Sequence, residues 1–265
     1  MKTVSTAERA VIKKDFREVW DSKMARTTLL IVPLLLVIVI PIVFLVVNIQ
    51  VPASEVNGVD KIMKMLPPEA RGYNIRQGTF YMMTNTMFPM FFLMIPLMTS
   101  SVSAASSFVG ERERGTLETL LLTPMTLPRI FKAKVLGCIS LSAIVTGLSF
   151  AAFAIVISVG DILLGMPFFL NWSWLVCVLL FAPAVTVFGV VFMVLVSSKS
   201  KSYIEAIQTS GYIVLPIILI FAGQLAGLFS LNAFHLLLIS VVIMILDAVI
   251  WVITARSFRA EKLLR

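Results

Sequence analysis

The sequence predicts an all-α integral membrane protein with six transmembrane helices. Its 265 residues have a mean hydropathy of +0.99, and 59% of them are hydrophobic whereas 14% are charged. That balance leaves too few polar side chains to cover a soluble domain of this length. Six apolar runs are long enough to cross about 30 Å of hydrocarbon as helices. We expect these spans at residues 28–48, 82–107, 135–159, 173–197, 207–229 and 234–255.

Residues 1–27 are predicted to form a cytoplasmic amphipathic helix, ahead of a six-span domain over residues 28–265. Apolar side chains recur there at helical spacing and basic side chains occupy another face, which is typical of helices that lie in the plane of a membrane. The apolar set is Ile12, Phe16, Val19, Trp20 and Met24, and the basic set is Arg9, Lys13 and Arg17. The alternative is that these basic residues only fix the topology of the first span.

The distribution of basic residues predicts that both termini are cytoplasmic. Lysine and arginine near the ends of spans are retained on the cytoplasmic side of a membrane. With the spans given above, 18 of the 22 basic residues fall on one side. The other four, Lys61, Lys64, Arg71 and Arg76, fall in an outer loop over about residues 49–81. Because topology accounts for the net charge of +8, we expect contact with membrane lipid and no nucleic-acid partner.

A loop over about residues 108–134 joins the second and third spans, and it contains the run GERERGTLETLLLTP. Leu117, Leu120 and Leu121 share one face of a predicted helix, with Thr116 as its N-cap and Pro124 as its stop. A helix of about eight residues is only about 12 Å long and is not stable alone in water. Either the ends of the protein's own spans cover the leucines, or a groove of a soluble partner does.

The run from Glu111 to Lys134, ERERGTLETLLLTPMTLPRIFKAK, resembles the cytoplasmic loop of permease subunits of type-2 ATP-binding-cassette exporters. In that family an acid-Arg-x-x-Gly-Thr-Leu-Glu-x-Leu-Leu-x-Thr-Pro run leads into a basic helix that begins the third span. The resemblance extends to the six-span plan, the cytoplasmic termini and the N-terminal in-plane helix. The connection between spans five and six is shorter than in many members, so the outer gate is expected to differ.

The resemblance implies that Thr116–Thr123 is a coupling helix that docks in a groove of a separate cytoplasmic ATPase subunit. It also implies two ATPase copies, a second copy of this permease or a similar one, and a multi-pass location in the cytoplasmic membrane of a prokaryote. ATP and Mg²⁺ would bind the ATPase and no cofactor would bind this chain, whose sequence has no G-x-x-x-x-G-K-[ST] phosphate-binding run. The residues expected at the ATPase contact are Glu111, Arg112, Glu113, Arg114, Gly115, Thr116, Leu117, Glu118, Leu120, Leu121, Thr123 and Pro124.

Two features of the spans are candidates for the substrate path. A methionine stripe in the second span suits a surface that accepts varied apolar partners, although helix packing or lipid contact explains it equally. Its members are Met83, Met87, Met90, Met94 and Met98. Asp247 is the one acid at midplane depth, where a charge is costly and a functional role is the default hypothesis. The alternative is a protonated side chain hydrogen-bonded to a neighbouring helix. Pro89 and Pro96 are expected to kink the second span.

These observations together predict the membrane permease half of an ATP-driven exporter rather than an enzyme. His235 is the only histidine, and no cluster has metal-ligand spacing. The apolar, methionine-rich span favours a hydrophobic or amphipathic substrate, such as a peptide, a drug or a lipid-like molecule, that leaves the cytoplasm or the inner leaflet. Two other classes stay open at this point: a secondary transporter or channel without an ATPase, and a membrane assembly subunit that does not transport.

Overall fold

The computed structural model describes residues 6–50, 66–67, 70–116, 125–197, 200, 202–225 and 232–257. Within these residues the fold is entirely helical, which confirms the predicted class. Six helical stretches in the described part are long and apolar enough to cross a membrane, as predicted. They are Ala25–Gln50, Ile75–Glu113, Leu127–Leu164, Trp172–Ser197, Tyr203–Gln224 and Ala233–Val252.

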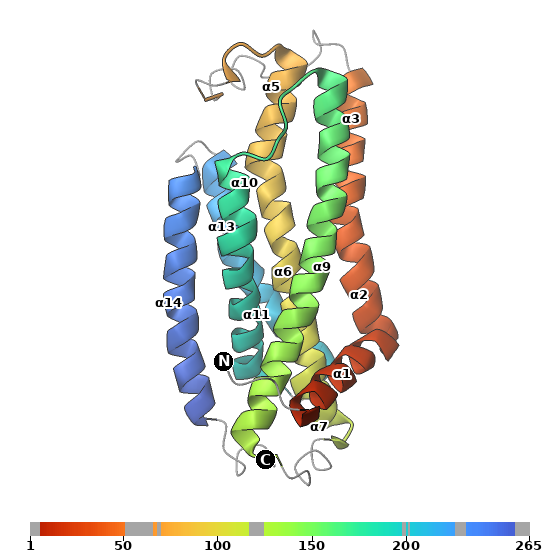
Figure 1. The fold of residues 1–265 in the computed structure, drawn as a ribbon, viewed down its shortest axis with the longest axis vertical. Coiled ribbons are helices and arrows are strands. Elements are labelled where there is room, and N and C mark those ends of the chain that lie inside the picture. Colours follow the sequence, from red (N-terminus) through yellow and green to blue (C-terminus); the bar gives the residue numbers. More distant parts are fainter. Residues whose placement is uncertain are drawn as a thin grey trace.

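Several of these spans are chains of shorter elements (Figure 1). The first consists of α2 (Lys23–Leu34), the π-helical η1 (Leu35–Val39) and α3 (Ile40–Gln50). The second consists of α5 (Ile75–Met82), the π-helical η4 (Met83–Met87), α6 (Phe88–Ala104), the π-helical η5 (Ala105–Gly110) and α7 (Glu111–Glu113). The third is the single helix α9 (Leu127–Leu164). The fourth consists of α10 (Trp172–Val176), the π-helical η6 (Cys177–Phe181) and α11 (Ala182–Ser197). The fifth consists of α12 (Tyr203–Ser210), the 3₁₀-helical η7 (Gly211–Ile213) and α13 (Val214–Leu225). The sixth is the single helix α14 (Ala233–Ser257).

The second and third spans are longer than the apolar runs that predicted them. They comprise 39 and 38 residues, and a helix of that length extends about 57 Å, well beyond about 30 Å of hydrocarbon. Residues 108–113 and 127–134, expected in a loop, are helical. The charged residues 111–114 and Lys134 have partners within the bundle, whereas Arg129 and Lys132 are exposed.

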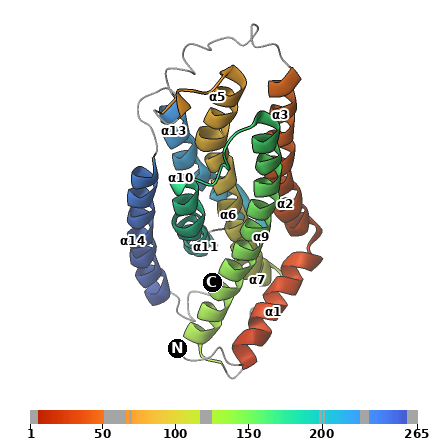
Figure 2. The same cartoon turned by 45° about the horizontal axis from the view of Figure 1, so that its top comes forward.

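Helix α1 (Thr6–Asp21) precedes the first span and lies obliquely beside α9 at one end of the bundle (Figure 1 and Figure 2). Ser22 separates it from α2, because the Ser22 Oγ accepts the N–H of Ala25 at 3.4 Å and caps the new helix. The face of α1 that is buried carries Val11, Asp15 and Val19, four residues apart. Trp20 of the predicted apolar face is 51% exposed, so the contact of α1 with lipid stays a prediction.

Three of the four described π-helical segments accommodate a proline. In each, the N–H of the residue before the proline donates to the carbonyl five residues earlier, instead of four. The wider turn gives room to a ring that would clash with the carbonyl four residues before it in an α-helix. The prolines are Pro41, Pro89 and Pro183. The kink expected at Pro89 is therefore a π turn, whereas Pro96 lies inside the continuous helix α6.

Helix α6 is the centre of the bundle and packs closely on α9 and α11 (Figure 1). A run of small residues, 99–107, permits the approach, as is common between membrane helices. The hydroxyls of Thr99 and Ser142 lie 2.6 Å apart between α6 and α9. On the other side, a Cβ at Gly189 of α11 would lie 2.1 Å from the Ser100 Oγ and 3.3 Å from the Leu97 carbonyl oxygen. Gly189 therefore lies at a close approach of the two helices.

We expect Gly189→Val to separate α6 from α11 and to lower stability by about 1–3 kcal/mol, the range for overpacked cores. The measurement is the melting temperature of the purified protein in detergent. Gly147→Val is the matched control, because a Cβ at Gly147 of α9 would meet no atom within 4 Å. Equal melting temperatures for the two variants would contradict the close approach at Gly189.

Candidate functional site: a buried charge cluster at the end of the second span

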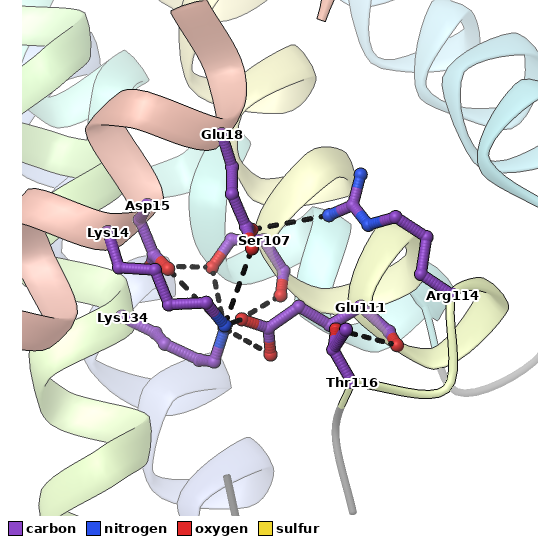
Figure 3. A network of polar contacts seen from close by, with 8 residues as sticks. All are labelled: Lys14, Asp15, Glu18, Ser107, Glu111, Arg114, Thr116 and Lys134. Atoms are coloured by element: carbon purple, nitrogen blue, oxygen red, sulfur yellow. Dashed lines mark hydrogen bonds and ion pairs between the residues drawn. The ribbon is translucent and has the colours of Figure 1, made fainter. Parts of the chain in front are cut away.

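Charged side chains from three parts of the chain meet where the second span ends. The residues are Asp15 from α1, Ser107 from η5, Glu111 from α7 and Lys134 from α9, and we call them the Lys134 cluster (Figure 3). All four are at most 4% exposed. Charges are rarely so deeply buried unless they are paired, so the contacts within the cluster determine whether the three helices can pack here.

The ammonium group of Lys134 is the centre of the cluster. Its Nζ lies 2.7 Å from the Glu111 Oε2 and 3.7 Å from the Asp15 Oδ1. It also donates to the carbonyl oxygen of Ser107 at 2.8 Å and to the Ser107 Oγ at 3.1 Å. The Phe108 ring covers it, with its centroid 5.5 Å from the Nζ. One cation therefore satisfies groups on α1, η5 and α7 at once.

Glu111, the first acid of the GERERGT run, has a second cation on its other oxygen. The Lys14 Nζ lies 2.7 Å from the Glu111 Oε1 and 3.4 Å from the Glu18 Oε1. Partial burial lowers the pKa of Lys14, but the hydrogen bond and charge of Glu111 outweigh that effect and raise the pKa overall. Lys14 therefore stays charged and ties α1 directly to the end of the second span.

Asp15 is the member of the cluster whose charge is least favoured. Its Oδ2 accepts the hydroxyl proton of Ser107 at 2.8 Å, whereas its Oδ1 has only the longer contact with Lys134. Burial raises the pKa of Asp15 to about 6, against the opposing effects of Lys134 and Ser107. Asp15 therefore changes its protonation state within a range of pH that cells experience.

The other three charged residues of the run, at positions 112–114, also have partners inside the described chain. Arg112 donates through its Nη2 to the carbonyl oxygen of Ser200. Glu113 accepts the N–H of Tyr203 at 3.0 Å, at the beginning of α12, where a carboxylate is favoured by the helix dipole. Arg114 lies 3.2 Å from the Glu18 Oε2 of α1. Together with Glu111, these contacts tie the run to the first helix and to the third and fifth spans.

Two residues with a defined backbone and hydrogen bond follow the charged side chains of this run. Gly115 has a φ of +68°, a left-handed conformation that favours glycine over other residues. The Thr116 Oγ1 then donates to the carbonyl oxygen of Glu111 at 3.3 Å. The predicted coupling residues Leu117, Glu118, Leu120, Leu121, Thr123 and Pro124 lie outside the described residues. The described residues of the predicted ATPase contact, 111–116, are thus attached mainly to the bundle itself. Glu111 is wholly buried there.

The Lys134 cluster is suited to holding helices together rather than to chemistry. The carboxylates of Asp15, Glu18 and Glu111 are within 4.8 Å of one another, which is close enough to share a cation. Two ammonium groups, Lys14 and Lys134, already occupy that role. We therefore interpret the site as an electrostatic joint and not as a metal centre.

Sequence reasoning found Glu111 but missed Asp15, Ser107 and Lys134. A signal was present, because each charged residue stands in a row of residues spaced by four that are otherwise apolar. Asp15 lies between Val11 and Val19, and Lys134 between Ile130 and Cys138; all of these are buried. A charge in an apolar row indicates a buried partner on a neighbouring helix.

The candidate substrate-path residues are dispersed over the spans. Met90 is buried and lines a cavity of about 40 Å³ with Pro89 and Leu236, whereas Met83, Met87 and Met94 are half-buried. Asp247 is 5% exposed, its Oδ1 has no hydrogen-bond partner among the described residues, and it does not line that cavity. Their role in transport stays a prediction.

Comparison with known proteins gives one match. Residues 9–257 fit the family model described as ABC-2 family transporter protein, a range that includes the Lys134 cluster and all six spans. Comparisons with curated proteins and with solved structures find no significant match.

We expect Lys134→Met to lower stability strongly, by about 3–5 kcal/mol, because it leaves the carboxylates of Asp15 and Glu111 buried without their shared cation. The measurements are the melting temperature and the yield of monodisperse protein in detergent. Lys132→Met is the matched control, since Lys132 is exposed two residues earlier on α9, and it should change little. A Lys134→Met protein as stable as the Lys132→Met protein would show that the cluster does not hold α1 in place.

The protonation of Asp15 should be visible in the pH dependence of stability. Its pKa of about 6 in the folded protein is above about 3.9 for an unfolded chain, so the folded state binds more protons between these values. The contribution of Asp15 to the unfolding free energy is therefore largest below about pH 4 and is lost as the pH rises through about 6. We expect Asp15→Asn to remove this slope, measured as the difference between wild-type and variant melting temperatures from pH 4 to 7. A difference that does not vary with pH would contradict the assignment.

Proposed function

Because the chain belongs to the ABC-2 family of transporter proteins, we propose that it is the permease half of an ATP-driven exporter that works with a separate ATPase subunit. The family accounts for a membrane component with transmembrane helices that does not itself catalyse a reaction. Membership favours this function over a secondary transporter, a channel or an assembly subunit. The coupling route, the stoichiometry and the substrate are parts of the same proposal.

The observation that carries the proposal is the attachment of the GERERGT run to the bundle. Each of its four charged side chains contacts another part of the fold: Glu111 the Lys134 cluster and Lys14, Arg112 the carbonyl of Ser200, Glu113 the start of α12 and Arg114 helix α1. A segment that begins at Thr116 follows directly. A displacement of that segment by a partner would reach α1, α9 and α12 without passing through a flexible linker.

The proposed partner is a soluble ATPase that binds the leucine face of residues 117–121. The end of the bundle that carries the Lys134 cluster would face the cytoplasm, since most basic residues of the sequence fall on that side. ATP and Mg²⁺ would bind the ATPase. In the described residues, α1, α7 and the carboxyl end of α14 lie at this same end (Figure 1).

The complete exporter would contain two permease chains and two ATPase chains. Along α9, an exposed apolar row that includes Leu148, Ile155 and Ile162 faces away from the bundle, and such rows require lipid or a second permease for cover. Two copies of this chain, or this chain with a similar one, would close the transport path between them. The chain would lie in the cytoplasmic membrane of a prokaryote.

The proposed substrate is hydrophobic or amphipathic. Support comes from the adaptable methionine side chains of the second span, of which Met90 lines a largely apolar cavity. Asp247 would act in the conformational cycle, since an acid that is buried in a span without a hydrogen bond is costly to retain.

We expect Leu120→Asp to abolish copurification of the ATPase, because a charge in a desolvated groove costs several kcal/mol unless it is paired. The matched control is Thr119→Asp, which places the same charge on the opposite face of the predicted helix and should preserve binding. The experiment is a detergent pull-down, with size-exclusion chromatography of the permease alone to establish folding. Aggregation of the Leu120→Asp permease by itself would show instead that the leucines pack on their own spans.

A further inference from the structure

We propose that the end of the bundle opposite to the Lys134 cluster holds a binding site for a protonated amine with an aromatic group. The site is a cavity of about 260 Å³ lined by residues of α5, η4, the carboxyl end of α9 and the connection 165–171. Asp161, which lines it, is 27 residues after Lys134, or about 40 Å along α9. The proposal is independent of the ATPase, because it concerns binding to the permease alone.

The cavity is large enough for a small organic molecule. A single water molecule needs about 10–15 Å³ of such space, and sites for drug-sized ligands begin at about 300 Å³. Five of the eleven described residues that line it are aromatic, and pairs of their rings pack against each other. The Tyr73 and Tyr81 rings have centroids 5.8 Å apart, and those of Phe168 and Phe169 are 5.0 Å apart. The faces of such rings attract cations as well as apolar groups.

Asp161 gives the cavity its charge. It is the single charged residue among the described residues that line the cavity, and it is only 4% exposed. Its Oδ2 accepts the N–H of Phe169 at 2.9 Å, and no other hydrogen bond reaches the carboxylate from the described residues. Arg71 and Arg76, which are close in sequence to Tyr73 and Phe80 of the cavity wall, are exposed and do not line the cavity. Among the described residues, the carboxylate therefore has no cation in the cavity.

Thr84 supplies a second polar group that lacks a partner. Its side chain is 2% exposed, it lines the cavity, and its Oγ1 has no hydrogen-bond partner among the described residues. A buried hydroxyl without a partner costs about 1–3 kcal/mol. A ligand that donates hydrogen bonds to both the Asp161 carboxylate and the Thr84 hydroxyl would satisfy both groups. An ammonium group has several N–H donors and a positive charge, which meets both requirements.

The walls of the cavity are fixed by hydrogen bonds that do not involve a ligand. Gln77 of α5 donates through its Nε2 to the carbonyl of Leu164 at 2.9 Å, and Asn171 donates through its Nδ2 to the Asn85 Oδ1. The indole N–H of Trp174 donates to the carbonyl of Thr84 at 3.2 Å, within the π-helical η4. A cavity that is formed in advance loses little entropy on binding.

The test uses phenethylammonium as the probe and 2-phenylethanol as a neutral molecule of nearly the same shape. Calorimetric titration is carried out on the full chain in phosphatidylcholine nanodiscs at pH 7.5, without any ATPase, so that the lipid carries no net charge. We expect the ammonium to bind the wild-type protein and the alcohol to bind at least about tenfold more weakly. That ratio of dissociation constants corresponds to a difference of about 1.4 kcal/mol in binding free energy.

Two variants separate the charge from the architecture. Asp161→Asn keeps an acceptor for the Phe169 N–H but removes the charge, and we expect it to weaken phenethylammonium binding about tenfold or more while leaving 2-phenylethanol unaffected. Thr84→Val removes the hydroxyl at nearly constant volume and should weaken ammonium binding by about tenfold. Asp15→Asn is the control for loss of a buried acid, because Asp15 is equally buried but lies on α1 and does not line the cavity.

Three results would overturn the proposal. They are a wild-type protein that does not bind the ammonium, an Asp161→Asn protein that binds it as tightly as wild type, and equal losses in Asp161→Asn and Asp15→Asn. Melting temperatures of all variants are compared with wild type in the same nanodiscs. Failure of this test would leave the ATPase pull-down unaffected, since that experiment depends on the other end of the bundle.

Discussion

The fold depends on one buried cation. Lys134 neutralises Glu111 and hydrogen-bonds Ser107, and it lies beside Asp15, so that α1, the end of the second span and the start of the third pack without an uncompensated charge. Removing such groups from water costs more than their attraction returns unless the geometry is good. The cluster is therefore weak as a source of stability but strong as a constraint on arrangement, because another position of α1 would take Lys14 and Asp15 away from Glu111, Lys134 and Ser107.

The pairing of buried charges also explains why the charged run of the second span serves as a joint. Its four side chains have partners on different elements, so the helix can extend beyond the hydrocarbon and still end in a defined direction. Gly115, with its left-handed backbone, follows this run directly. A run attached to several elements in this way suits the proposed coupling to an ATPase. The match to the ABC-2 family of transporter proteins supports this interpretation.

The architecture could be predicted from the sequence because it follows from length and hydropathy. Six apolar runs must become helices in a membrane, since only helices satisfy every backbone group there. The site could be predicted only in part. Glu111 belongs to a recognisable run, but Asp15 and Lys134 are far from it along the chain, and no local pattern pairs them. The cavity around Asp161 was missed for a related reason: its walls come from three separate segments. The π turns before Pro41, Pro89 and Pro183 show that proline predicted a local distortion without specifying its form.

Helix α9 differs from the first, second and fourth spans in having no π turn and no proline beyond its first turn. It runs unbroken from Lys134 to Asp161, and an unbroken helix resists bending over that length. Its two ends consequently behave as the ends of a rod. A tilt imposed at the buried lysine must be matched by a displacement at the opposite membrane surface, whereas the spans with widened turns can absorb motion along their length. The third span is thus stiff along its whole length, whereas the first, second and fourth spans are jointed.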